Sequence, residues 1–400
     1  MTGTRDAAAA AEAADRPPVK AADRPPVEAA DRPAVEAADR RVVEAADHPA
    51  VEAADRAAEV VAAARAGDAD AFAGLVEPHR RELRVHCYRM LGSYDEAEDL
   101  VQETFLRAWK GRRGYAGRSS FRAWLYRIAT NACLDVLAGR TRRILPQQLA
   151  GPAEPTASLP PRHDLPWLQP FPDELWEPAG PIDAQPEALV VARETMELAF
   201  LAAIQYLPPR QRAVLILRDV LGWPAKQVAV LLDGTPAGVN SALQRARGTL
   251  RERLPERRAD WSPPPPPGPR ERAALRRYMA AVERADLAVV AELLAEEVRT
   301  AMPPYPMWYA GREAVLATLA TSWDPASPHW VGRFRVLPVR ANGGPAMATY
   351  LAGAGERTYR AAAIAVPRME GERITELTAF HDPGLFPAFG LPSELPGGYR

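Results

Sequence analysis

Residues 207–223 read L-P-P-R-Q-R-A-V-L-I-L-R-D-V-L-G-W, and this stretch opens the most informative part of the chain. A short apolar segment, P-A-K-Q-V-A-V-L-L, comes next, and then a D-G-T-P turn and the segment A-G-V-N-S-A-L-Q-R-A-R-G-T-L-R-E-R-L. Prolines 208 and 209 suit the first turn of a helix. Thr235 before Pro236 supplies an N-cap and a proline at the first helical position. We therefore expect one helix over 207–223, a short second helix and a longer third, in a helix-turn-helix layout.

The third helix separates into two faces. Its apolar residues, spaced by four, three and four positions, are predicted to face the protein interior: Val239, Leu243, Ala246 and Leu250. Polar residues with the same spacing lie on another face, where amides can pair with adenine edges and guanidinium groups with guanine or phosphate. The predicted DNA-contacting residues are Thr235, Asn240, Ser241, Gln244, Arg245, Arg247 and Arg251. A solvated basic helix is the alternative, and spacing alone does not separate a repressor from other DNA-binding proteins.

The charge distribution favours nucleic acid, although the net charge of the chain is −1. Residues 65–143 carry 15 basic and 10 acidic side chains, and residues 204–258 carry 10 and 4. Residues 144–203, which lie between them, carry 2 basic and 9 acidic side chains. Two basic blocks separated by an acidic one can each exchange counterions with a phosphate backbone.

Residues 60–143 read as helices that bury Cys87 and Cys133. The two cysteines are far apart in sequence, which predicts neither a metal site nor a disulfide framework and suits a reducing cytoplasm. The first sixty residues repeat an octad with interrupting prolines, so we expect a disordered tail there. No run of residues is apolar and long enough to cross a bilayer, so a cytoplasmic protein is expected. No cofactor is expected either.

Residues 270–390 differ in pattern from the rest of the chain. One amphipathic helix at 271–296 and a shorter one at 312–320 are expected to precede strands at 330–340, 345–352, 358–366 and 373–381. Helices followed by a strand meander predict an α+β domain with a curled antiparallel sheet.

Two segments resemble extracytoplasmic-function sigma factors of the sigma-70 family. S-Y-D-E-A-E-D-L-V-Q-E-T-F-L-R-A-W (93–109) with F-R-A-W-L-Y-R-I-A-T-N-A-C-L-D (121–135) resembles region 2, and P-P-R-Q-R-A-V-L-I-L-R-D-V-L-G-W with V-N-S-A-L-Q-R-A-R resembles region 4. The C-terminal part is similar to SnoaL-like (NTF2-like) domains. The resemblance implies a multidomain protein with an all-α region 2, a helix-turn-helix region 4 and an α+β NTF2-like cone.

The expected domain boundaries come from the resemblance and from composition. They are disordered repeats at 1–60, region 2 at 66–143, an acidic Pro-rich linker at 144–185, region 4 at 186–258, a polyproline spacer at 259–269 and the SnoaL-like domain at 270–390.

The resemblance also implies two binding surfaces in region 2. The family docks its 93–109 helix on the β′ subunit of RNA polymerase, which points to Asp95, Glu96, Glu98, Asp99, Gln102, Glu103 and Arg107. Unstacked bases of a −10 element need aromatic faces and cations. The residues predicted to contact the −10 DNA are Ser119, Ser120, Phe121, Trp124, Arg127, Asn131, Arg140, Arg142 and Arg143. The last three are expected to contact phosphate. A place in the core is the alternative for Trp124.

In the C-terminal domain, aromatic residues could line a pocket or fill the core. The candidates are Tyr305, Trp308, Tyr309, Trp323, Trp330 and His381. His381 and Asp382 are a conceivable acid/base pair, but neighbours on a strand point to opposite faces.

We therefore predict a sigma factor, not an enzyme, that acts with the β and β′ subunits of core RNA polymerase on −10 and −35 promoter elements. Its C-terminal domain is expected to regulate transcription initiation. A small-molecule ligand of that domain and an anti-sigma factor are candidate further partners. The alternatives are a small-molecule enzyme or ligand-binding protein that uses the C-terminal pocket, and a stand-alone helix-turn-helix repressor.

Overall fold

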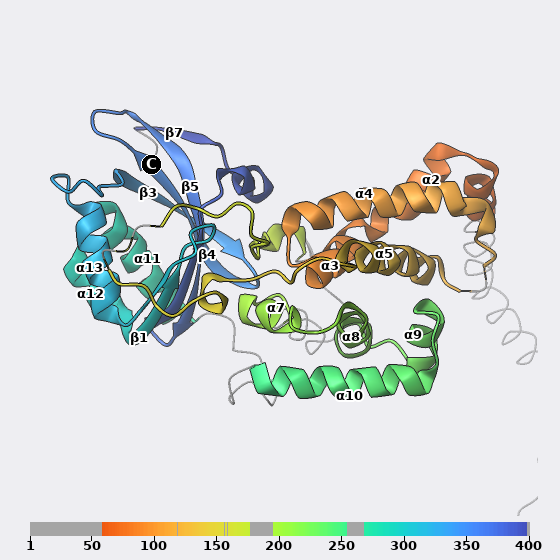
Figure 1. Ribbon diagram of the computed structural model, residues 1–400. Coiled ribbons are helices and arrows are strands. Elements are labelled where there is room, and N and C mark those ends of the chain that lie inside the picture. Colours follow the sequence, from red (N-terminus) through yellow and green to blue (C-terminus); the bar gives the residue numbers. More distant parts are fainter. Residues whose placement is uncertain are drawn as a thin grey trace, which may run out of the picture. The chain divides into compact units, whose positions relative to one another are not determined.

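The computed structural model describes residues 58–117, 119–155, 157, 159–176, 195–253 and 268–397 (Figure 1). Residues 1–57 of the predicted repeats, residues 177–194 and residues 259–267 of the predicted spacer lie outside the described residues. The described helices and strands from Ala69 onward belong to one compact unit, Val60–Arg400.

The first helical module (residues 60–143) consists of helices α2 (Ala69–Val76), α3 (Arg80–Leu91), α4 (Tyr94–Gly111) and α5 (Phe121–Leu137). Asp68, Ser93 and Ser120 cap the N-termini of α2, α4 and α5 with side-chain oxygens that accept backbone N–H groups. Between α2 and α3 the chain makes a 3₁₀ turn, Glu77–His79, which contains Pro78. Leu83, Met90 and Leu125 are fully buried in the core of this module.

The second helical module (residues 195–253) confirms the helix-turn-helix prediction. It contains α7 (Leu198–Ile204), α8 (Pro209–Leu215), α9 (Ala225–Leu231) and α10 (Pro236–Arg253). Figure 1 shows α10 beneath α8 and α9, against which it packs. The expectation of one regular helix over 207–223 was wrong in part. After α8 the chain widens into a π-helical turn, Ile216–Val220, and Trp223 N donates to Leu217 O across the end of that turn.

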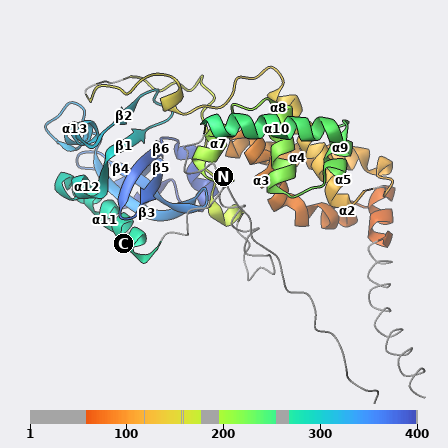
Figure 2. The ribbon, with the colours of Figure 1, turned by 90° about the horizontal axis from the view of Figure 1, so that it is seen from below.

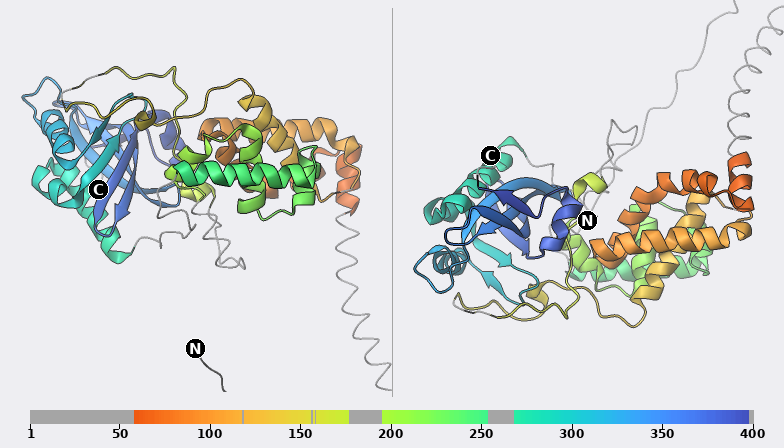
Figure 3. Two further views of the ribbon diagram at one scale, coloured as in Figure 1. Left: turned by 60° about the horizontal axis from the view of Figure 1, so that its bottom comes forward. Right: turned by 90° about the horizontal axis from the view of Figure 1, so that it is seen from above.

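Both ends of the described part of the linker (residues 144–176, the connecting segment) pack against the helices, and its middle contacts the sheet domain. Trp167, Leu168 and Phe171 are buried, and Ile144 O accepts from Leu168 N at 3.0 Å. Gly92 has a φ of +70°, and a Cβ there would lie 2.6 Å from Leu168 Cδ2. The close approach therefore requires glycine at this helix end. Figure 3 shows the segment in yellow, running from the helices to the sheet domain and back.

The sheet domain (residues 268–397) places helices α11 (Pro269–Arg284), α12 (Leu287–Leu293) and α13 (Arg312–Trp323) beside a curled sheet (Figure 2). The bounds of the strands are β1 Leu294–Ala301, β2 Trp308–Ala310, β3 Arg333–Ala341, β4 Gly344–Ala352, β5 Thr358–Glu370, β6 Arg373–Phe380 and β7 Glu394–Pro396. The order of the main strands is β2-β1-β6-β5-β4-β3, with β7 paired to β5. The 3₁₀ helix Pro383–Phe389 follows β6.

Two expectations for this domain were wrong. The helix predicted over 271–296 breaks at Ala285, which has a φ of +54°, and Asp286 caps the next helix by accepting from Val289 N. The sheet is not wholly antiparallel, because β1 pairs parallel with β6. Strand β1 was not predicted because its charged residues Glu296, Glu297 and Arg299 continue the amphipathic pattern of the preceding helix.

Candidate nucleic-acid interface

Helix α10 has one buried and one exposed face. Val239, Leu243, Ala246 and Leu250 are buried, as the spacing predicts, and Ala242 joins them. Thr235 Oγ1 accepts from Gly238 N at 3.1 Å, which fixes the start of the helix after the turn. The polar residues of the other face are exposed: Asn240, Ser241, Gln244, Arg245 and Arg251. Exposed amide and guanidinium groups on one ridge can reach base edges in a major groove.

Arg247, another predicted DNA contact on α10, is engaged within the chain. Its Nε and Nη2 donate to the two carboxylate oxygens of Asp219 at 2.8 Å each. The hydrogen bonds to Asp219 raise the pKa of Arg247, so the guanidinium stays charged. This bidentate pair joins α10 to the π-helical turn and gives Arg247 a structural role.

An aromatic cluster lies at the start of α5. The ring centroids of Tyr115, Phe121 and Trp124 are 5.2–5.4 Å apart, and all three side chains are partly exposed. The exposed Ser119 and Ser120 lie beside the cluster, and Ser119 O accepts from Tyr115 Oη at 2.9 Å. Half-exposed rings of this kind can stack on unpaired bases. Trp124 is thus neither fully core nor fully surface.

All four arginines that were predicted to contact the −10 element have partners inside the chain. Arg127 pairs with Asp233 at 3.1 Å, and Arg140 pairs with Glu96 at 2.8 Å, each with its side chain about half exposed. The Arg142 guanidinium lies 4.2 Å from the centre of the Tyr206 ring. The fourth arginine, Arg143, is more deeply buried than these three.

Only 16% of the Arg143 side chain is exposed, and both ends of its guanidinium are engaged. It pairs with Glu96 at 2.8 Å and donates to Trp167 O at 2.6 Å. The predicted phosphate contact is therefore not open to Arg143 in this arrangement, in which the residue holds the connecting segment instead.

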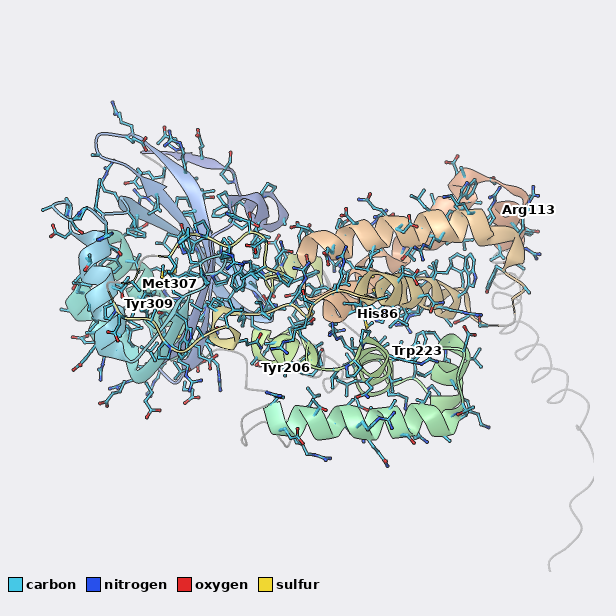
Figure 4. The ribbon with its side chains drawn as sticks, viewed as in Figure 1. His86, Arg113, Tyr206, Trp223, Met307 and Tyr309 are labelled. Carbon is cyan, nitrogen blue, oxygen red and sulfur yellow. The ribbon has the colours of Figure 1, made fainter. Side chains whose placement is uncertain are left out.

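The two helical modules share one hydrophobic core. Trp223 of the second module is labelled in Figure 4. The ring of Tyr126 in α5 contacts its indole in a tilted arrangement with centroids 5.0 Å apart, and Arg122 lies over the same indole. Arg212 of α8, which is buried, donates to Met90 O. Because Arg127 and Arg142 also make their contacts across this boundary, the packing occupies part of the surface that was predicted to meet DNA.

The acidic helix α4 presents a mixed surface. Asp95, Asp99 and Gln102 are exposed, and Leu106 is 53% exposed, a large apolar side chain left in solvent. Within the helix Glu103 pairs with Arg107 at 2.8 Å, and Arg107 also pairs with Asp135 of α5 at 2.9 Å. Glu98 is engaged by Arg84, and Glu96 by Arg140 and Arg143. The part of the α4 surface that stays available to a partner protein is therefore smaller than the sequence predicted.

The sheet domain encloses a cavity of about 450 Å³. Tyr305, Tyr309, Trp323 and His381 line it, and Figure 4 shows Tyr309 beside Met307, another lining residue. Trp308 and Trp330 are not among the lining residues.

Trp308 Nε1 points toward the connecting segment, where it donates to Ala150 O at 2.8 Å. His381 follows the last residue of β6 rather than lying on a strand, and the Asp382 carboxylate accepts from Gly384 N at 2.9 Å.

Pro155 and Ala157 of the connecting segment also line the cavity, which the sequence did not indicate. Among the described residues, no three His, Cys, Asp or Glu side chains gather as a metal site would require. No helix in the described ranges combines the length and the apolar character needed to span a bilayer.

Three parts of the chain match known families. Residues 75–143 match Sigma-70 region 2, residues 197–250 match Sigma-70, region 4, and residues 275–377 match the SnoaL-like domain. These matches fall on the first helical module, the second helical module and the sheet domain.

Similar proteins agree with the family matches. The ECF RNA polymerase sigma factor SigG of Mycobacterium tuberculosis (strain H37Rv) is 45% identical over 333 residues, which is 83% of this chain and 86% of that protein. SigW of Bacillus subtilis is 29% identical over 47% of this chain and 91% of its own length. The crystal structure of the M. tuberculosis sigma factor SigJ shares the fold, with a TM-score of 0.51 at 23% identity, over 79% of this chain and 98% of that one.

Proposed function

Because this chain belongs to the extracytoplasmic-function family of RNA polymerase sigma factors, which direct transcription initiation, we propose how its residues divide that task. The second helical module reads the −35 element through the exposed face of α10. The observation that supports this most is the separation of the two faces, with Asn240, Gln244 and Arg245 exposed on the side opposite the buried Val239. Amide and guanidinium groups there can discriminate adenine and guanine edges.

The first helical module would contact the −10 element. The cluster of Tyr115, Phe121 and Trp124 offers ring faces to unstacked bases, and Asn131 lies on the same helix, α5. Arg140 and Arg142, both exposed, would neutralise phosphate once their internal partners are released. Arg143 is left out of this assignment because it is bound to the connecting segment.

Core polymerase would dock on α4, with the β′ subunit against the stripe Asp99, Gln102 and Leu106. An exposed leucine between polar residues is typical of a docking surface whose centre becomes buried in the complex. The exposed acids around it add charge complementarity toward a basic partner. The β subunit would contact the second helical module.

The sheet domain would regulate initiation and carry out no catalytic turnover of its own. Its hairpin residue Asn342 is hydrogen-bonded to Phe171 of the connecting segment and to Tyr88 of the first helical module. Holding that segment in place favours the packed arrangement in which Arg127 and Arg142 are occupied by the second helical module. An anti-sigma factor is a further proposed partner, and the site of action is the cytoplasm, where polymerase and promoter DNA meet.

The polymerase interface can be tested with two leucine variants. Leu106→Ala should weaken binding of the full chain to core polymerase by about 1–2 kcal/mol, as expected when an interface centre loses its apolar anchor. Leu149→Ala, also an exposed leucine but outside α4, is the matched control and should bind like the wild type. Equal affinities of all three proteins in a fluorescence titration would reject the assignment of α4.

A further inference from the structure

The cavity of the sheet domain has a lining without charged side chains of Asp, Glu, Lys or Arg. Its wall is built largely from aliphatic, methionine and aromatic residues, with hydroxyls from a few threonines and one serine. A volume of about 450 Å³ falls in the range of pockets for small organic ligands. Two histidines, His329 and His381, are the ionisable side chains of the lining apart from tyrosines, so an ionised ligand would lose its hydration here without gaining a carboxylate, ammonium or guanidinium partner, which is unfavourable. The lining therefore selects for uncharged, mainly apolar molecules.

One polar group in the lining is suited to orienting such a ligand. His381 lies at the end of β6 with its ring 5.5 Å from that of Tyr305 in an edge-on arrangement. Burial lowers the pKa of His381 to about 4, so its imidazole is neutral at physiological pH. A neutral imidazole offers one donor and one acceptor, which suits a carbonyl or hydroxyl group on the ligand.

The connecting segment closes part of this cavity and is tied to it by several hydrogen bonds. Ala153 N donates to Trp308 O at 2.8 Å, which fixes the segment to the edge strand β2. Tyr309 Oη donates to Ala157 O at 3.4 Å, and Thr318 Oγ1, whose proton is donated to Ala314 O at 2.9 Å, lies 3.3 Å from Pro155 O. Tyr309, Thr318, Pro155 and Ala157 are all lining residues as well. The same stretch of chain thus forms the cavity wall and part of the covalent connection between the two helical modules.

We propose that this cavity is a binding site for an uncharged, predominantly apolar small molecule, and that its occupancy is sensed by the connecting segment. A ligand can contact Pro155 and Ala157 only while the connecting segment is docked on the sheet domain. The ligand therefore binds the docked state more tightly than the undocked state, and this difference in affinity stabilises docking. Docking in turn favours the packed helical modules, so the ligand lowers promoter-specific transcription. This regulatory step rests on the proposed sigma-factor function, whereas the binding site does not.

The test uses a pair of probes that differ by one charge. N-phenyl-1-naphthylamine is uncharged and apolar, and 8-anilino-1-naphthalenesulfonate is the same skeleton with a sulfonate. With the full chain, the uncharged probe should give a saturable fluorescence increase with one site per chain, at an affinity at least tenfold higher than the sulfonate. No saturable binding, or equal affinities of the two probes, would overturn the site.

Two variants localise the binding. Ala379→Phe fills the cavity from its half-buried wall position and should abolish saturable binding, whereas Ala317→Phe, at an exposed position of α13 outside the lining, should retain it. Circular dichroism melting checks that both variants are folded. The comparison of the two probes on the wild type stands even if Ala379→Phe does not fold. Probe binding unchanged in a folded Ala379→Phe protein would place the site elsewhere.

Transcription with core polymerase then tests the coupling. The uncharged probe should reduce promoter-specific transcripts at least threefold with the wild type and leave those of Ala379→Phe unchanged. Saturable binding without any change in transcription would overturn the sensing role and leave the binding site. Absence of promoter-specific transcripts with every protein would reject the proposed function instead, while the fluorescence titration would still decide the binding site.

Discussion

Asn342, at the turn between β3 and β4, donates from Nδ2 to Tyr88 Oη of α3 at 2.8 Å, and both residues are buried. The same amide donates to Met196 O at 2.8 Å and accepts from Phe171 N at 3.0 Å. A single side chain of the sheet domain therefore satisfies groups in both helical modules and in the connecting segment. Buried networks of this kind are costly to leave incomplete.

Asn342→Ala should lower the free energy of unfolding by about 2–4 kcal/mol, because several buried polar groups lose their partners. Urea unfolding monitored by tryptophan fluorescence measures the change. Asn240→Ala, which truncates an exposed asparagine, is the control and should cost less than about 0.5 kcal/mol. A loss below that value for Asn342→Ala would show that the network contributes little.

Arg143 and Arg140 both pair with Glu96, which makes them a matched pair for mutation. Arg143→Ala should lower the free energy of unfolding by about 1–3 kcal/mol, since Trp167 O also loses its charged donor. Arg140→Ala, at an exposed position, should change it by less than about 0.5 kcal/mol.

Promoter binding as a function of salt should show the reverse order. Arg140→Ala should reduce the slope of log affinity against log salt by roughly 1, and Arg143→Ala should leave it unchanged. A reduced slope for Arg143→Ala with unaltered stability would restore the phosphate role that the sequence suggested.

The region 2 fold and the helix-turn-helix could be predicted largely from the sequence, because their signals are local. Serine and aspartate caps, apolar stripes and the Thr235-Pro236 pair each act within one or two turns of helix. Strand β1 was missed because its charges fit a helical period as well as a strand, and only pairing with β6 decides between them. The contribution of Pro155 and Ala157 to the cavity depends on tertiary packing of small side chains, which leaves no periodic signal.

His86 should make the first helical module sensitive to acid. Its Nε2 lies 2.9 Å from Thr130 Oγ1, whose own proton is donated to Tyr126 O, so Nε2 carries the hydrogen. Burial lowers the pKa of His86 to about 3, with Arg89 and Arg122 adding repulsion. Below pH 6.5 the unfolded chain binds a proton that the folded chain excludes, so stability falls as the pH falls toward 3.

The free energy of unfolding should therefore decrease by up to about 1.4 kcal/mol per pH unit from this group, with the full effect reached near pH 3. His86→Gln removes the titrating group and should flatten the profile between pH 6.5 and 4, measured by urea unfolding at each pH. His381→Gln is a useful comparison, because the pKa of His381, lowered to about 4, predicts the same sign in the sheet domain. A profile unchanged by His86→Gln would mean that the imidazole is protonated in the fold.

Gln244→Ala and Arg251→Ala should separate base reading from phosphate binding on α10. Loss of the exposed Gln244 amide should cost about 1–3 kcal/mol and relax preference at a single −35 position. Loss of Arg251, which lies in the last turn of the helix, should weaken binding to all promoters alike and reduce its salt dependence. Competition binding against a library of −35 variants distinguishes these outcomes, and a uniform loss for Gln244→Ala would contradict its assignment.

The most direct test of the proposed division of tasks is transcription in vitro with core RNA polymerase and the full chain on a pool of genomic promoters. Promoter-specific transcripts that depend on the added chain are expected, with a higher yield from Asn342→Ala, in which the sheet domain no longer holds the connecting segment. No promoter-specific initiation with either protein would contradict the sigma-factor assignment of these residues, and equal yields from the two would contradict regulation by the sheet domain.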